Sequence, residues 1–129
     1  YFSFNSLTSL PVIDDDKDVR DLMNRMLDDI GVRSIEARDG KEGLERTKDK
    51  PSLIVLDLEM PRMDGFEFLE NLIEIKEESE RPNVLVYSGK DLTDVQEELL
   101  KQNVEGLIKK DDVSINQLPG MVSKILSKS

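Results

Sequence analysis

Hydrophobic positions along the chain alternate between short apolar runs and longer stretches with helical spacing. Apolar runs that suit strands occupy residues 10–13, 33–37, 53–56, 83–87 and 106–109. Stretches with apolar side chains at helical spacing follow each run, at about 17–30, 40–50, 65–77, 93–101 and 115–126. Since consecutive parallel strands are joined by right-handed helical crossovers, five such repeats predict an α/β fold with an open parallel sheet covered by helices.

The third run, residues 53–56, is the clearest of the five strands. Its sequence Leu-Ile-Val-Leu has no polar alternation, as expected for a strand buried on both faces of a parallel sheet. Asp57 ends this run, and a turn containing Pro61, Asp64 and Gly65 leads to the next helix. An aspartate in this position can simply terminate a strand, so other residues must decide whether it has a function.

Several polar residues directly follow predicted strands. Asp14 and Asp15 follow the first strand, Asp57 the third, Ser88 the fourth and Lys110 the fifth. Ligands of open parallel sheets bind outside the carboxyl ends of the strands. We therefore expect these residues, distant in sequence, to converge at one edge of the sheet.

The chemistry of this set indicates a metal-assisted phosphoryl site. Three crowded carboxylates repel one another, and a divalent cation relieves that repulsion. Oxygen ligands without Cys or His indicate Mg²⁺, with Mn²⁺ as a substitute. Lys110 and Ser88 suit an anionic phosphoryl group, and aspartate is a known covalent acceptor of such groups.

Composition and charge limit the alternatives. The chain has 129 residues, 37% of them hydrophobic, which predicts a single domain over residues 10–129. Residues 1–9 resemble a linker or cloning remnant. The net charge of −10 disfavours nucleic acids and anionic membranes as direct partners. Because the sequence also lacks a signal-peptide pattern and an apolar run of about 20 residues, we expect a cytoplasmic protein.

Five sequence blocks resemble, in order, those of the response-regulator receiver domain of two-component signalling. They are residues 12–16, 53–57, 60–65, 86–89 and 106–110. The resemblance covers about residues 10–127. It implies a flavodoxin-like sheet with the strand order 2-1-3-4-5.

This resemblance also implies a metal site. Asp15 would ligate Mg²⁺ directly, and Asp14 would do so mainly through water. Asp57 and the backbone carbonyl of Glu59 would complete the protein ligands.

By the same resemblance, Asp57 is the phosphoacceptor. Ser88 would contact the phosphoryl group after transfer, and Lys110 would pair first with Asp57 and then with the phosphate. Glu59 and Lys90 each lie two residues beyond a site residue, and we expect them to flank the mouth of the site. There they either pair across it or stay solvated and independent.

The implied function is signalling rather than enzymatic turnover. The phosphoryl group would come from a histidine kinase, from a histidine phosphotransfer domain, or from the kinase core of the same polypeptide in a hybrid sensor kinase. Phosphorylation would switch a protein-interaction surface on the fourth helix, fifth strand and fifth helix. The chain itself would catalyse only its own phosphorylation and slow dephosphorylation.

Two positions depart from the family pattern. Asp111 follows Lys110 where the family usually has proline, which predicts a different conformation for this loop. Leu107 occupies a position that is commonly aromatic, so a rotating ring cannot couple to Ser88. Tyr87 cannot replace that ring, because adjacent strand residues face opposite sides.

Two other functions use a similar sheet. A phosphatase of the haloacid dehalogenase type also has an aspartate at a strand end, but it requires Asp-x-Asp where this chain reads Asp57-Leu58-Glu59. A flavodoxin-like binding module would have a hydroxyl-rich phosphate loop after the first strand. Here three aspartates occupy that loop, and they would repel a phosphate.

Overall fold

Five parallel strands form the centre of the molecule. The computed structural model describes residues 9–74, 81–89 and 91–128. The strands are β1 (Leu10–Ile13), β2 (Ser34–Ala37), β3 (Leu53–Asp57), β4 (Asn83–Ser88) and β5 (Gly106–Lys109). Their order across the sheet is β2-β1-β3-β4-β5. The predicted fold class and strand order are therefore confirmed.

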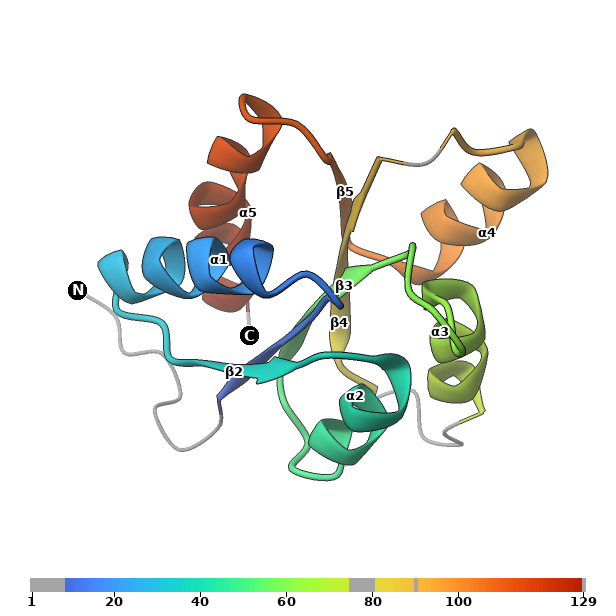
Figure 1. Cartoon of the computed structure of the whole chain (residues 1–129), viewed down its shortest axis with the longest axis horizontal. Coiled ribbons are helices and arrows are strands. Elements are labelled where there is room, and N and C mark those ends of the chain that lie inside the picture. Colours follow the sequence, from blue (N-terminus) through green and yellow to red (C-terminus); the bar gives the residue numbers. More distant parts are fainter. Residues whose placement is uncertain (1–8, 75–80, 90, 129) are drawn as a thin grey trace.

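Helices cover both faces of this sheet (Figure 1). On one side lie α1 (Lys17–Asp29) and α5 (Leu118–Ser127). On the other side lie α2 (Gly40–Thr47), α3 (Gly65–Ile73) and α4 (Asp94–Asn103). Every residue of β3 is buried, which explains the absence of polar alternation in its sequence.

Successive residues of a strand pack in two separate apolar cores, one on each face of the sheet. Val55 packs with Leu27 of α1 and Val122 of α5, whereas its neighbour Leu56 packs with Phe68 of α3 and with Leu100 of α4. Side chains alternate across a strand, so both faces of the central strands must be apolar. The two cores thus fix the strand register and, with it, the positions of the residues that follow each strand.

Short polar side chains begin most of the helices. Asp16, Asp39 and Asp64 accept hydrogen bonds from backbone N–H groups in the first turns of α1, α2 and α3. Thr93 forms a capping box with Gln96 at the start of α4. Asp64 belongs to the turn predicted from the sequence, and in the structure it also caps the helix that follows this turn.

Several predicted helix boundaries differ from the structure. Helix α2, predicted to about residue 50, ends at Thr47. The last helix, predicted from residue 115, is divided into a 3₁₀ turn, η2 (Ser114–Gln117), and α5, which begins at Leu118. Pro119 explains the division, because its ring would clash with the carbonyl of Ile115 in a continuous helix. Helix α3 ends at Ile73. Its predicted continuation to residue 77 falls largely on residues 75–80, outside the described part of the chain.

Substitution of Gly65 tests how closely α3 approaches the end of β3. A Cβ at this position would lie 2.7 Å from Leu58 Cα and 2.8 Å from the Asp57 carbonyl oxygen, both backbone atoms. Gly65→Ala should therefore lower the free energy of unfolding by about 1 to 3 kcal/mol, measured by urea denaturation.

The matched control is Gly120→Ala within α5, where a Cβ would meet no atom within 4 Å. That variant should gain about 0.5 to 1 kcal/mol, because alanine restricts the unfolded chain and favours helix. Equal effects of the two substitutions would show that α3 does not need this close approach.

Candidate functional site

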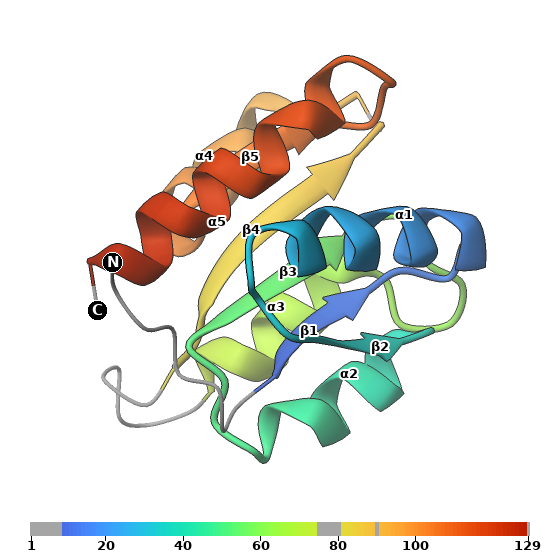
Figure 2. The same ribbon diagram turned by 90° about the vertical axis from the view of Figure 1, so that its left-hand side faces the viewer.

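The carboxyl ends of four strands bring the predicted site residues to one edge of the sheet. All strands are parallel, and their arrowheads point to the same side of the molecule (Figure 2). Asp14 follows β1, Asp57 is the last residue of β3, Ser88 is the last residue of β4, and Lys110 follows β5. The convergence expected from the sequence is therefore present in the structure.

Three carboxylates form a cluster at this edge. Asp14, Asp15 and Asp57 each offer an oxygen, and these oxygens lie within 4.8 Å of one another. Asp14 and Asp57 are each only 1% exposed, whereas Asp15 is exposed. One exposed and two buried carboxylates make a site that solvent reaches from one side.

Local hydrogen bonds orient the two buried carboxylates. The backbone N–H of Asp16 donates to Asp14 Oδ1 over 2.8 Å, and that of Glu59 donates to Asp57 Oδ1 over 3.0 Å. The Oδ2 atoms of Asp14 and Asp57 are buried and accept no hydrogen bond from the described residues. Each carboxylate therefore presents one oxygen with unused acceptor capacity to the centre of the site.

Burial dominates the electrostatics of this pair. It raises the pKa of Asp14 to about 7, with backbone donation from Asp16 opposing the shift and the nearby charge of Asp57 adding to it. Burial also raises the pKa of Asp57, against the effect of the Glu59 N–H. These two carboxylates are costly to ionise together without additional positive charge.

The chemistry of this cluster fits a divalent cation with oxygen ligands. Hard cations such as Mg²⁺ bind carboxylate oxygens and keep several waters, which the exposed side at Asp15 allows. The buried Oδ2 atoms of Asp14 and Asp57 accept no hydrogen bond from the described residues, and their close cationic neighbour there is the Lys110 ammonium, so they keep acceptor capacity for a metal ion. A metal role for the Glu59 carbonyl remains a prediction.

Among the residues that the structure describes, Lys110 brings its positive charge close to both buried carboxylates. Its Nζ atom lies 3.4 Å from Asp57 Oδ2 and 3.9 Å from Asp14 Oδ2. Burial acts to lower the pKa of Lys110, but the charges of Asp14 and Asp57 outweigh it and raise that pKa. Lys109, the residue before it, pairs with Ser88 in the strand register and is exposed.

Ser88 contacts a carboxylate that the sequence did not connect with it. Its hydroxyl donates to Glu59 Oε1 over 3.1 Å, and the backbone N–H of Gly89 donates to the same oxygen over 2.8 Å. The side chain of Glu59 thus bridges the loops that follow β3 and β4. Lys90, the predicted partner of Glu59, lies outside the described residues.

Arg20 of α1 is a further residue that sequence reasoning missed. Its Nη1 donates to the Asp14 carbonyl over 2.8 Å, and its Nε pairs with Glu36 Oε1 over 3.0 Å. The guanidinium thus fixes the backbone of the acidic loop. The only sequence signal is an arginine one helical turn after the run of aspartates.

The two departures from the family pattern have clear structural outcomes. The peptide bond between Lys110 and Asp111 is trans. Leu107 is 43% exposed at the sheet edge, while Tyr87 is buried in the core beneath α1 and α5. Tyr87 therefore does not occupy the position of the missing aromatic residue.

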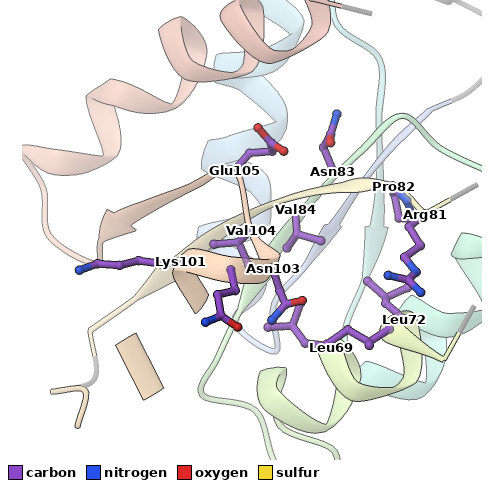
Figure 3. Close-up of a pocket in the computed structure, with 12 residues that line it drawn as sticks. Leu69, Leu72, Arg81, Pro82, Asn83, Val84, Lys101, Asn103, Val104 and Glu105 are labelled. Carbon is purple, nitrogen blue, oxygen red and sulfur yellow. The ribbon is translucent and has the colours of Figure 1, made fainter. Parts of the chain in front are cut away.

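A separate pocket of about 330 Å³ lies at the opposite edge of the sheet (Figure 3). The ends of α3 and α4 and the starts of β4 and β5 surround it. Its lining includes Leu69, Leu72, Arg81, Lys101 and Glu105. None of the predicted site residues lines this pocket.

Comparisons with known proteins identify the family. The family model described as response regulator receiver domain matches residues 10–123. The chain belongs to this family, and its fold and acidic site agree with that class. The resemblance inferred from the sequence is confirmed.

Individual relatives agree with this assignment. Sporulation initiation phosphotransferase F of Bacillus subtilis is 30% identical over 89 residues, which are 68% of this chain and 72% of that protein. The sensor histidine kinase CheAY of Helicobacter pylori is 36% identical over 85 residues, which are 64% of this chain but 11% of that protein. The chain spans half or less of the length of several curated relatives that it matches.

Solved structures of receiver domains have the same fold. The N-terminal domain of a response regulator receiver protein from Methanoculleus marisnigri JR1 has a TM-score of 0.71 and 30% identity, covering 96% of this chain and 100% of that one. The receiver domain of the Francisella response regulator 1452 has a TM-score of 0.79 and 27% identity, covering 94% and 98%. In the described part of this chain, no helix has the length and apolar character needed to cross a membrane.

The raised pKa of Asp14 predicts how stability depends on pH without metal. The folded protein holds this proton with a pKa of about 7, against an ordinary value of 3.8. Stability from Asp14 is therefore fully present below pH 3.8 and is lost as the pH rises to 7. Asp14→Asn should raise the free energy of unfolding at pH 8 by on the order of 1 to 4 kcal/mol, and much less at pH 4.

Thermal and urea unfolding in the presence of EDTA would measure this effect. Asp16→Asn is the control, because Asp16 caps α1 and asparagine caps helices equally well. A gain for Asp14→Asn that is the same at pH 4 and pH 8 would contradict the assignment.

Proposed function

We propose that Asp57 accepts a phosphoryl group from a phosphohistidine and that this transfer switches the chain between two signalling states. The observation that carries the proposal is the setting of the Asp57 carboxylate. It is buried beside Asp14 and Asp15, and Lys110 Nζ lies 3.4 Å from it. A nucleophile of this kind, flanked by an acidic cluster and a cation, suits phosphoryl transfer to a carboxylate.

In the transfer, a carboxylate oxygen of Asp57 forms a bond to phosphorus. The bond between phosphorus and the imidazole nitrogen of the donor breaks, and the imidazole leaves with the electron pair and takes up a proton. Lys110 is placed to pair with Asp57 before transfer and with a phosphoryl oxygen afterwards. The hydroxyl of Ser88 is a donor for another phosphoryl oxygen once it leaves Glu59.

Mg²⁺ would be held by Asp14, Asp15 and Asp57, with Mn²⁺ as an alternative. When bound, the ion would neutralise charge on the acidic cluster and on the incoming phosphoryl group. Glu59 would add its backbone carbonyl as a ligand.

The partner class follows from the donor chemistry. The sequence contains no histidine, so the phosphohistidine must belong to another domain or protein. We propose a histidine kinase or a histidine phosphotransfer domain as that partner, either separate or in the same polypeptide. The similarity to a segment of the sensor histidine kinase CheAY supports the arrangement in one polypeptide.

The output would be a change of surface rather than turnover of a substrate. A phosphoryl group carries about −1.5 to −2 charges and would attract Ser88 and Lys110, which lie at the ends of β4 and β5. Movement of these two loops would shift a population of states on the surface of α4, β5 and α5.

We propose that the protein is cytoplasmic.

Phosphorylation of Asp57 is tested directly with a small-molecule donor. Incubation with acetyl phosphate and Mg²⁺ should add one phosphoryl group to the parent, detected by intact-protein mass spectrometry. Asp57→Asn should show no addition, because the amide lacks the nucleophilic carboxylate. Asp16→Asn is the control and should be phosphorylated like the parent, since Asp16 caps α1 and is not in the cluster.

The proposed transfer would fail this test if Asp57→Asn gained the group as readily as the parent. It would also fail if EDTA left the rate unchanged.

The contact between Glu59 and Ser88 leads to a prediction about anion affinity. The Glu59 carboxylate occupies the Ser88 hydroxyl and the Gly89 N–H, and its charge repels an incoming anion. Glu59→Gln should therefore bind the phosphoryl mimic beryllofluoride about three- to tenfold more tightly, since a nearby like charge costs about 1 kcal/mol in a solvated setting. Tryptophan is absent, so isothermal titration calorimetry with Mg²⁺ present is the suitable measurement.

Glu105→Gln is the charge-matched control, because it removes a carboxylate at the opposite edge of the sheet. Equal affinities of the two variants for beryllofluoride would show that Glu59 does not compete for these donors.

A further inference from the structure

The carboxylate of Asp111 makes three hydrogen bonds, although the residue is exposed. Its Oδ1 accepts from the backbone N–H groups of Val113, over 3.0 Å, and Ser114, over 2.6 Å. Its Oδ2 accepts from the Ser114 hydroxyl over 2.9 Å. Both oxygens therefore hold the start of η2, directly after the site lysine.

The backbone around Lys110 is fixed on both sides. The N–H of Lys110 donates to the Ser88 carbonyl over 3.0 Å, and the N–H of Asp111 donates to the Lys109 carbonyl over 3.0 Å. Proline, the usual residue at this position in the family, has no N–H and could not make the second bond. This chain thus builds the loop with hydrogen bonds that a proline ring would prevent.

The 3₁₀ turn η2 is itself anchored to the apolar core. Ile115 is buried at 5% exposure and packs in the core beneath α1 and α5. Its N–H donates to the Asp111 carbonyl over 3.2 Å. A continuous path of contacts therefore runs from the core through η2 and Asp111 to the backbone of Lys110.

The position of the Lys110 ammonium depends on how this path of contacts holds the Lys110 backbone. A lysine side chain has four rotatable bonds and loses up to about 2 kcal/mol of rotamer entropy when it is ordered. Its Nζ must nevertheless stay 3.4 Å from Asp57 Oδ2. The Lys110 stem also passes Gly89, where an added Cβ would lie 3.3 Å from Lys110 Cβ. Small changes in the backbone direction at Lys110 would therefore move the ammonium away from the acceptor.

We propose that Asp111 is a positioning residue for Lys110: its carboxylate, by holding the start of η2, sets the backbone direction from which Lys110 reaches Asp57. This inference rests on the proposed function, in which Lys110 contacts the phosphoryl group. The competing explanation is that Asp111 only stabilises the turn, with no effect on the lysine.

Two substitutions of Asp111 and one of its neighbour separate these explanations. Asp111→Ala removes all three side-chain hydrogen bonds, whereas Asp111→Asn keeps an oxygen that can accept from Val113 and Ser114. Asp112→Ala is the matched control, because it removes an equal charge one residue along, and the Asn116 side chain donates only to the backbone carbonyl of Asp112. Lys110→Ala reports the full contribution of the lysine.

The first readout is independent of phosphorylation. In NMR spectra of the Mg²⁺-loaded protein, the Lys110 side-chain Cε and Nζ resonances of Asp111→Ala should move toward the values of a free lysine. They should stay near the parent values in Asp111→Asn and Asp112→Ala. Unchanged Lys110 resonances in Asp111→Ala would overturn the proposal.

The second readout is the rate of phosphorylation by acetyl phosphate at saturating Mg²⁺. Asp111→Ala should lose about tenfold in rate, since small misplacements of a reacting group are costly, and Asp111→Asn should recover most of that loss. Equal rates for Asp111→Ala and Asp112→Ala would overturn the proposal. So would a loss in Asp111→Asn as large as that in Asp111→Ala, accompanied by a parallel fall in melting temperature.

Lys110→Ala distinguishes a failure of this inference from a failure of the proposed function. If Lys110→Ala is phosphorylated as fast as the parent, the role of Lys110 in transfer is wrong, and the NMR readout alone decides whether Asp111 positions it. If Lys110→Ala is slow while Asp111→Ala is normal, the proposed function stands and the positioning role of Asp111 is wrong.

Discussion

The chemistry of the site depends on the burial of two carboxylates at one edge of the sheet. Asp14 and Asp57 are each 1% exposed, and an ionised carboxylate in such surroundings is unfavourable unless it is paired. In the described part of the chain, the Nζ atom of Lys110 lies 3.4 Å from Asp57 Oδ2 and 3.9 Å from Asp14 Oδ2. When both carboxylates are ionised, one positive charge faces two negative ones, and this excess of negative charge makes the site suitable for a divalent cation.

The scaffold keeps that unfavourable arrangement in place by fixing the backbone on each side of it. Arg20 holds the carbonyl of Asp14, and the Asp16 N–H holds one oxygen of its carboxylate. On the other strand, Gly65 lets α3 approach the backbone of Asp57 and Leu58, and the Glu59 N–H fixes Asp57 Oδ1. Each carboxylate can therefore point inward, since its surroundings leave it little freedom to rotate toward solvent.

The fold and the position of the site could be predicted from the sequence because both follow from strand direction. Once the apolar runs are assigned to parallel strands, the residues that follow them, such as Asp57 and Lys110, must meet at one edge. The division of the last helix at Pro119 was also accessible, because proline has a known effect on the preceding turn. The prediction placed Pro119 in the first turn of this helix, as it is in α5, but began the helix too early, at residue 115 instead of Leu118.

The contacts made by flexible polar side chains could not be predicted in this way. Glu59 reaches Ser88 and Gly89 across about 30 residues of sequence, and nothing in the apolar pattern selects that rotamer. The bond from Arg20 to the Asp14 carbonyl depends on the placement of α1 over β1, and on the charge of Glu36 on β2. The departure at Asp111 was visible in the sequence, but its effect on the loop was not, because the hydrogen bonds to Ser114 exist only after η2 has packed.

These side-chain contacts give the resting state its own network of donors and acceptors. Glu59 holds the hydroxyl of Ser88 with a negative charge, so an arriving phosphoryl group meets a donor that is already engaged. The proposed switch is then an exchange of one anion for another at the same hydroxyl, and the free energy available for loop movement is the difference between the two interactions. Leu107 provides no aromatic ring that could couple this exchange at Ser88 to the outer strand β5. The conformational change must therefore pass through the backbones of the loops after β4 and β5. Those loops are joined by the bond from the Lys110 N–H to the Ser88 carbonyl, which links the backbones of the two residues whose side chains would contact the phosphoryl group.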